Sequence, residues 1–147
     1  MDRSRFRRGQ SAVTRLENWP TLLSLYVDSR RSQPFAWGTN DCCIFAADWV
    51  LIATGHDIAS AFRGGYAGAL GANRIIREAG GIENLLAEHA PGLQRISHKL
   101  VGRGDLVLRT FENGPTLGIN LGAIDCFVAE HGLAFVPLDD RATCWRL

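Results

Sequence analysis

The stretch Phe35–Cys42 reads FAWGTNDC and leads directly into CIFAADWVLIAT at residues 43–54. Asp41 is a favoured helix N-cap residue, and Gly55 is a favoured C-cap residue. The sequence between these two positions therefore predicts a helix. Because the segment is apolar almost all round, we expect this helix to be buried in the core. A loop thus delivers Cys42 to the first turn of a buried helix.

This position has a chemical consequence for Cys42. Unpaired N–H groups and the helix dipole stabilise an anion at a helix N-terminus, so the thiolate is favoured. The same N–H groups can hold a developing oxyanion. The alternative is that Cys42 and Cys43 are small core hydrophobes, which is the commonest role of a cysteine.

The composition suits one globular domain. The chain has 147 residues, of which 46% are hydrophobic and 21% are charged. The net charge of +1 gives no strong field toward nucleic acid, so we expect no nucleic-acid partner. No apolar run approaches ~18 residues, so we expect no membrane span. Met1–Gln10 lacks an apolar signal core, so we expect no signal peptide and synthesis in the cytoplasm.

The cysteine spacing favours free thiols. No two cysteines form a C-x-x-C pair, so neither a zinc site nor a disulfide framework is predicted, and we expect no cofactor. The four cysteines are Cys42, Cys43, Cys126 and Cys144.

The N-terminus is basic, with seven of the fifteen arginines in the first 31 residues. We interpret residues 1–17 as an N-terminal arm and residues 18–147 as a single domain. The arm is either a solvated terminus or a segment that docks on an acidic partner surface.

The remaining pattern places helices first and strands after them. A helix is expected from Asn18 to Arg31, with Pro20 in its first turn. Two short helices follow at 72–79 and 82–89. Strands are expected at 94–100, 105–111, 116–121, 125–130, 134–138 and 143–147. This order predicts an α+β fold in which a buried helix packs on an antiparallel meander sheet.

Three motifs occur in an informative order. Trp37-Gly38 followed by Asp41-Cys42 resembles the signature of the NlpC-type cysteine peptidases, a papain-like superfamily that cleaves cell walls. Gly104–Val107 resembles the glycine-aspartate-leucine strand opening of that family, and Leu117–Gly122 resembles its next strand. The segment between the first two motifs is similar to a branch of small proteins encoded among phage and prophage tail genes.

The resemblance implies a papain-like fold with Cys42 at the nucleophile position. Cys43 falls where the family usually has serine. The family's catalytic histidine would stand at Thr116, which cannot take a proton near neutral pH. The third, orienting polar residue would lie where Val128 and Ala129 are found. The base position is therefore vacant.

His131 offers one replacement for the missing base. If Gly122-Ala123 is the turn of a hairpin, Thr116 faces Ala129 and His131 lies just beyond it. His131 is then either a displaced base or an exposed hairpin tip.

Other polar and aromatic residues receive structural interpretations. His56 follows the helix at the end opposite Cys42, so we exclude it as a base. Asp48 is expected to pair with an arginine, and Asp105 is expected to anchor a turn. The four tryptophans are expected to be packing anchors, with Trp37 and Asp41 beside the cleft at Cys42. The loop ending at Tyr66 either covers that cleft or merely joins two helices.

Three functions follow from these observations. The first is a structural or assembly protein of a phage, prophage or gene-transfer-agent tail, with other virion proteins as partners and a degenerate peptidase fold. The second is an active peptidoglycan hydrolase that serves tail-mediated DNA entry. The third is a metal or iron–sulfur centre built from the four cysteines. The first two imply synthesis in a host cytoplasm followed by residence in the virion tail.

Overall fold

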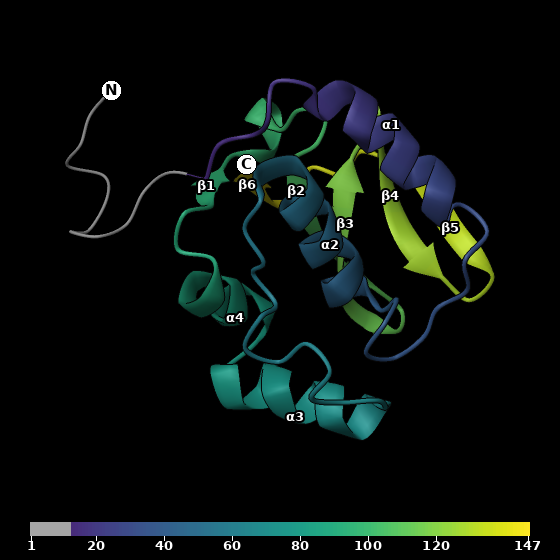
Figure 1. The fold of residues 1–147 in the computed structure, drawn as a ribbon, viewed down its shortest axis with the longest axis vertical. Helices are drawn as coiled ribbons and strands as arrows, with labels where there is room; N and C mark the ends of the chain where they lie inside the picture. The colour runs from purple at the N-terminus through teal and green to yellow at the C-terminus, as the bar shows by residue number, and fades with distance from the viewer. Residues whose placement is uncertain (1–12) are drawn as a thin grey trace.

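The computed structural model describes residues 13–147 as an α+β domain (Figure 1). This part of the chain contains four α-helices, one short 3₁₀ helix and six strands. The helices are α1 (Trp19–Arg30), α2 (Cys42–Thr54), α3 (Ala69–Ala79) and α4 (Ile82–His89). The strands are β1 (Gln94–Ile96), β2 (Leu106–Phe111), β3 (Gly114–Asn120), β4 (Ile124–Ala129), β5 (Gly132–Pro137) and β6 (Thr143–Arg146).

The six strands form one antiparallel sheet in the order β1-β6-β2-β3-β4-β5. The meander β2–β5 agrees with the prediction, and β6 returns to lie between β1 and β2. In the β3–β4 hairpin Ile119 pairs with Cys126, as the predicted turn requires. The β3–β4 ladder consists of the pairs Ile119–Cys126 and Asn120–Asp125 and does not extend to the expected Thr116–Ala129 pair. The Ala129 carbonyl instead accepts the Phe35 N–H at 3.2 Å.

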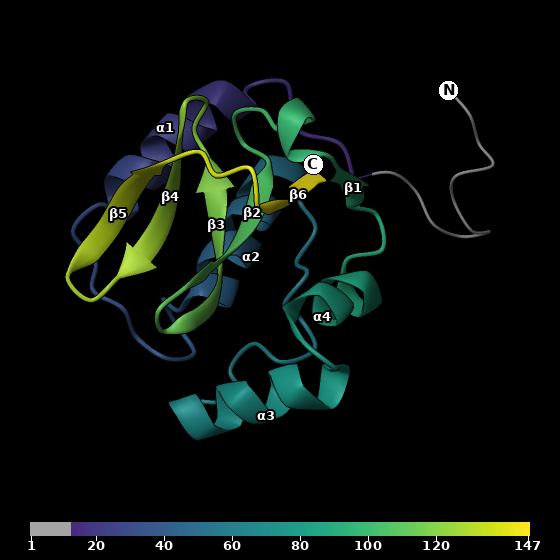
Figure 2. The same cartoon turned by 180° about the vertical axis from the view of Figure 1, so that it is seen from behind.

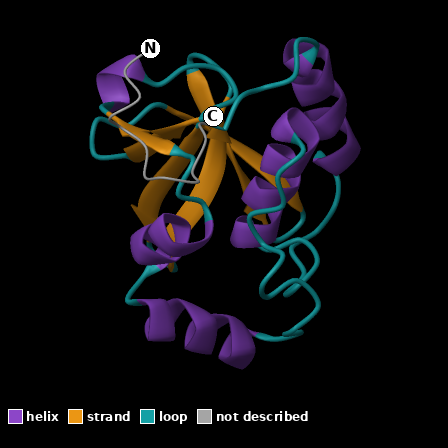
Figure 3. Cartoon of the chain, turned by 60° about the vertical axis from the view of Figure 1, so that its left-hand side comes forward, coloured by secondary structure: helices purple, strands orange, loops and turns teal. Residues whose placement is uncertain are grey.

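Helices α1 and α2 lie against one face of the sheet, and the connection from β5 to β6 crosses the other face (Figures 1 and 2). Figure 3 shows the same helix and strand layers from the side. Side chains alternate along a strand, so Leu117 and Ile119 pack in the cluster with α2. Val107 and Phe127 belong to a separate cluster on the opposite face.

Helix α2 is the centre of the core, as its apolar sequence predicts. Phe45 and Trp49 are fully buried. The Trp49 Nε1–H donates to the Gly104 carbonyl at 2.8 Å, which ties α2 to the turn before β2. Tyr26 of α1 stacks on Phe45 and donates its hydroxyl to the Phe45 carbonyl at 2.6 Å. Trp37, by contrast, is 40% exposed and packs edge-on against the ring of Phe35, so it is not a core residue.

The described start of the chain is attached to the domain. The Leu16 N–H donates to the Ala53 carbonyl at 2.7 Å. Arg15 pairs with the buried Asp105, whose other oxygen accepts the Gly102 N–H at 2.9 Å. Asp105 therefore anchors a turn, as expected. Most of the predicted arm, residues 1–12, lies outside the described residues.

Two boundaries differ from the prediction by three residues or more. Helix α3 begins at Ala69, three residues early, with Gly68 as its N-cap. The expected strand 94–100 is a strand only to Ile96, because the Ser97 hydroxyl accepts the Lys99 N–H and starts a 3₁₀ turn over 98–100. In the described part of the chain, no helix is both long and apolar enough to cross a membrane.

Candidate functional site

Asp41 organises the loop that carries Cys42. Its Oδ1 accepts the Ile44 N–H at 2.9 Å, which is the predicted helix cap. Its Oδ2 accepts the Gly38 N–H at 2.9 Å and the Tyr66 hydroxyl at 2.5 Å. Asp41 is buried, and these three bonds fix the start of α2 against two separate loops.

Gly38 allows the closest approach between those loops. Its φ is +82°, which favours glycine, and a Cβ there would lie 2.4 Å from the Tyr66 carbonyl oxygen. The FAWGTNDC loop therefore packs backbone to backbone against the segment that brings Tyr66 over Asp41.

Arginine pairs hold the segment that leads to Tyr66. Arg63 contacts Asp48 of α2 at 2.8 Å and Asp57 at 2.9 Å. Asp48 also pairs with Arg30 of α1 at 2.7 Å, which confirms the structural pair expected for it. The loop is thus fixed to α2 at Asp48, the carboxylate that also pairs with α1, before it reaches the site.

Cys42 lies where a thiolate is stabilised. A hydrogen bond from the neighbouring Cys43 thiol lowers the pKa of Cys42 below its ordinary value of 9.0, and the Leu117 N–H of β3 adds to this effect. Burial and the negative charge of Asp41 oppose it. The same interaction raises the pKa of Cys43, so of the two adjacent thiols only Cys42 is activated.

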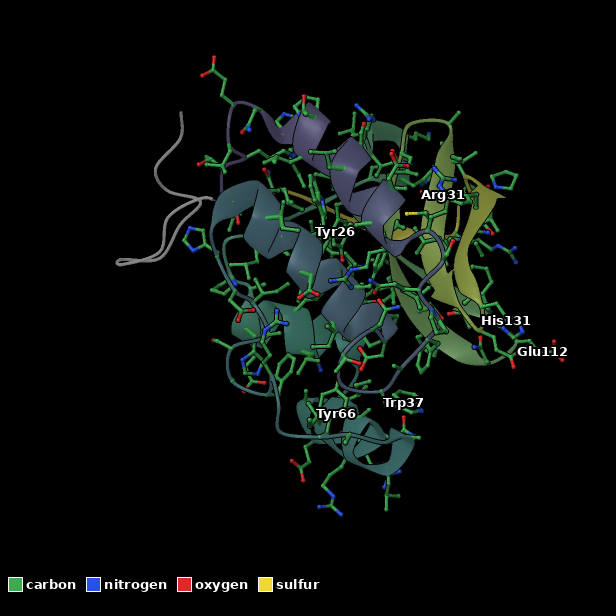
Figure 4. The ribbon with its side chains drawn as sticks, turned by 45° about the vertical axis from the view of Figure 1, so that its right-hand side comes forward. Tyr26, Arg31, Trp37, Tyr66, Glu112 and His131 are labelled. Carbon is green, nitrogen blue, oxygen red and sulfur yellow. The ribbon has the colours of Figure 1, made fainter. Side chains whose placement is uncertain are left out.

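The cleft beside Cys42 is mainly apolar. Trp37, Asp41 and Tyr66 line it together with both cysteines, as the sequence predicted for the first two. Its remaining wall comes from Phe62 and from apolar side chains of α3 and α4, namely Ala72, Ile75, Ile76 and Leu85. In Figure 4, Trp37 and Tyr66 lie on the side of the molecule occupied by α3. The loop ending at Tyr66 thus covers the cleft as well as joining two helices.

Thr116 lies beside the site in sequence, but its side chain points elsewhere. Its neighbour Leu117 faces α2, so alternation sends Thr116 to the opposite face. Its cross-strand partner Arg109 lies over Phe127 on that same face. The strand therefore presents to Cys42 the backbone N–H of Leu117 and not the side chain at position 116.

The four histidines, all in the described part of the chain, do not line the Cys42 cleft. His131 occupies the turn between β4 and β5, its side chain is 89% exposed, and its nearest acid is Glu130 at 3.9 Å. Figure 4 shows it at the outer end of that hairpin, near Glu112 and away from Trp37 and Tyr66. This is the exposed hairpin tip that the sequence left as the alternative to a base.

The two residues at the position expected for the third, orienting polar residue have apolar surroundings or no polar side chain to offer. Val128 is buried and packs in the cluster with α2. Ala129 contributes only its carbonyl, which is bonded to Phe35. Neither offers a group that could orient an imidazole.

Sequence reasoning missed two features of the site. The first is the pair of donors to Cys42, the Cys43 thiol and the Leu117 N–H; only the adjacency of the two cysteines hinted at it. The second is His89, which lines a small cavity together with Cys43 and Leu117. Its ring packs edge-on against the ring of Phe62, with 5.3 Å between the two ring centroids. The position of His89 at a helix end gave no sign of this neighbourhood.

The cysteines do not form a common centre. Cys126 packs on the face with α2, whereas Cys144 belongs to the cluster on the other face. Within residues 13–147, no three His, Cys, Asp or Glu side chains are grouped so as to hold a metal ion. The four thiols are therefore not brought together as the four-cysteine metal hypothesis requires.

Comparison with known proteins gives a family assignment. No curated protein and no solved structure matches the chain. One family model matches residues 14–147, which span both the Cys42 site and the whole sheet. The chain therefore belongs to the family described as Domain of unknown function (DUF6950).

Proposed function

We propose that this chain is a structural or assembly protein of a phage-type tail that has a papain-like, NlpC-type fold without the peptidase reaction. The observation that carries the non-catalytic role is the strand beside Cys42. It offers the thiol a backbone N–H from Leu117, while Thr116 points to the other face. A cysteine peptidase needs a base within hydrogen-bonding reach of the thiol.

The papain-like assignment is supported by the arrangement of the elements. A cysteine at the N-terminus of a buried helix packs beside an antiparallel sheet, and the three sequence motifs lie at the helix start and on two adjacent strands. The tail role rests on the resemblance of the segment between the motifs to tail-encoded proteins. The fold alone does not determine a function.

The test uses the phage, prophage or gene-transfer agent that encodes the chain. Deletion of the gene is expected to abolish assembled tails, counted by electron microscopy. Cys42→Ala is expected to give wild-type numbers of tails and wild-type DNA delivery. Normal tails from the deletion strain would contradict the assembly role.

An active peptidoglycan hydrolase is the second candidate, and the lowered pKa of Cys42 favours it. It predicts that the purified chain releases soluble fragments from sacculi, and that Cys42→Ala reduces this release by roughly 10³-fold or more. Folded Cys42→Ala particles that assemble but fail to deliver DNA would support the hydrolase over the structural role.

Thr116→His tests the orientation of Thr116, on which the proposal depends. If the side chain at 116 faces away from α2, a histidine there does not reach the thiol, and hydrolysis and Cys42 alkylation stay at wild-type rates. Alkylation accelerated by an imidazole at 116 would contradict the orientation of Thr116, and with it the observation that carries the proposal.

A further inference from the structure

A second pocket lies on the sheet face opposite Cys42. The connection between β5 and β6 crosses this face (Figure 2), and residues of this connection line the pocket. Val107 of β2, Asp125 of β4 and Cys144 of β6 form part of the wall, and Leu138, Asp139 and Asp140 of the connection form another part, with His98, Val101 and Ala142 beside them. None of these residues belongs to the cleft at Cys42.

Asp125 is the unusual residue of this pocket. It is completely buried, and its Oδ1 accepts the Asn120 side-chain amide at 2.9 Å. Its Oδ2 has no hydrogen-bond partner among the described residues. A buried carboxylate oxygen without a donor is costly, and such groups in folded proteins usually have a partner.

Arg109 balances the charge of Asp125 without supplying that donor. Its Nη1 lies 3.6 Å from Asp125 Oδ2, which is too long for a hydrogen bond. The same nitrogen donates to the Pro137 carbonyl at 2.7 Å, and the guanidinium lies over the ring of Phe111. Arg109 is therefore held by other contacts, and Asp125 Oδ2 is left without a donor in the described part of the chain.

The lining specifies the chemistry of that donor. Asp125, Asp139 and Asp140 give the pocket three carboxylates, of which Asp139 is already paired with Arg109 and Arg141. His98 adds an imidazole, while Val107 and Leu138 give the pocket apolar surface. We propose that this pocket binds a primary ammonium group on a short aliphatic stem. One N–H bonds Asp125 Oδ2, the positive charge faces Asp140, and the stem lies on the apolar wall. An ammonium group is compact and carries three N–H donors, which suits the space beside Asp125 because the planar guanidinium of Arg109 already lies there.

The test is a titration of the ¹⁵N-labelled chain with n-butylammonium at neutral pH. Chemical-shift changes are expected at Val107, Asp125, Leu138 and Cys144, with n-butanol as the neutral control of the same shape. Because butanol has no charge, it is expected to bind at least ~10-fold more weakly. Equal shifts with butanol, or none with either compound, would overturn the proposal.

Three variants locate the interaction. Asp125→Asn removes the unpaired acceptor and is expected to weaken butylammonium binding by roughly 10-fold or more. Asp140→Asn changes an exposed side chain of the pocket, so the fold is retained, and binding is expected to weaken by roughly 3-fold. Glu112→Gln makes the same charge change at an exposed hairpin outside the pocket and should leave affinity unchanged. Wild-type affinity in a folded Asp125→Asn or in Asp140→Asn would overturn the proposal, as would a matching loss in Glu112→Gln.

The ammonium can belong to a free amine or to a lysine side chain, and a third ligand distinguishes them. Nα-acetyl-lysine methylamide presents the same head group with a peptide backbone. If it binds as tightly as butylammonium, the pocket accepts lysine side chains of a partner. If only butylammonium binds, the pocket is closed to peptides and takes free amines.

Discussion

Cys42 differs from the other three thiols in the charge state that its surroundings favour. Donors from Cys43 and Leu117 lower its pKa. Burial raises the pKa of Cys144 to about 11 and that of Cys126 to about 12. At neutral pH the described surroundings therefore favour one nucleophilic sulfur.

We expect iodoacetamide to modify Cys42 first. Since the thiolate is the nucleophile, the rate should rise with pH through a midpoint below 9.0 for Cys42 and level off above it. Modification is followed by peptide mass spectrometry, with Cys42→Ser as the control that removes the fast phase. A fast phase that persists in Cys42→Ser would assign the reactivity to another cysteine.

Gly38 gives a second residue-scale prediction. Gly38→Ala combines backbone strain at φ +82° with a Cβ 2.4 Å from the Tyr66 carbonyl oxygen. Gly64→Ala has a similar φ of +77° but open space around its Cβ, so it isolates the strain. We expect about 1 kcal/mol of destabilisation for Gly64→Ala and about 2–4 kcal/mol for Gly38→Ala, measured by urea unfolding. Equal losses in the free energy of unfolding would show that the two loops move apart to admit the Cβ without a cost in stability.

At the scale of the elements, the start of α2 depends on one carboxylate. Asp41→Ala removes the helix cap and leaves the Gly38 N–H and the Tyr66 hydroxyl without their acceptor. We expect a loss of about 2–4 kcal/mol in the free energy of unfolding. Tyr66→Phe removes only one of the three bonds and is expected to cost about 1–2 kcal/mol.

The two variants together test whether Asp41 connects the loops. In a double-mutant cycle the losses should be less than additive, because Tyr66 has no bond left to lose once Asp41 is gone. Additive losses would show that the Tyr66 hydroxyl donates its hydrogen bond to an acceptor other than Asp41.

The elements themselves were largely predictable from local signals. Asp41 and Gly55 bound α2 as their capping preferences require. The turn at Gly122 sets the β3–β4 register. The strand ending at Ile96 was predicted too long, because the side-chain bond of Ser97 competes with the strand and carries no periodic signal.

The site was predictable only as far as one chain segment determines it. Cys42 at a helix start follows from its own neighbours in sequence. The bond from Tyr66 to Asp41 and the approach of the Leu117 N–H join segments 25 or more positions apart. The side of the sheet that Thr116 faces depends on which face of β3 meets α2. Neither the contacts between these distant segments nor the face that Thr116 occupies is encoded in the residue spacing of a single segment.

At the scale of the whole molecule, the N-terminal segment and the sheet are joined through one buried carboxylate. Arg15 is mostly buried and pairs with Asp105, and it also donates to the Arg103 carbonyl at 2.7 Å. The guanidinium lies over the ring of Trp19, 4.2 Å from its centroid. The Arg15–Asp105 pair links the segment before α1 to the start of β2.

Arg15→Met is therefore expected to destabilise the whole domain by about 3 kcal/mol, because it leaves Asp105 buried without its cation. Arg95→Met removes an exposed pair with Glu83 and is expected to cost less than about 1 kcal/mol. Chemical unfolding of both variants measures the difference. A loss in Arg15→Met as small as that in Arg95→Met would show that the amide donors to Asp105 suffice.

The hydrogen bond from the Leu133 N–H to the Arg31 carbonyl has a consequence for how copies of the chain meet. On an outer strand, alternate residues direct their amides away from the sheet, so in β5 these are Leu133, Phe135 and Pro137. The first amide is occupied by Arg31, and the third position has no N–H. Of these three, only Phe135 can offer a donor to an incoming strand, which makes the growth of the sheet into a fibre by edge addition unfavourable.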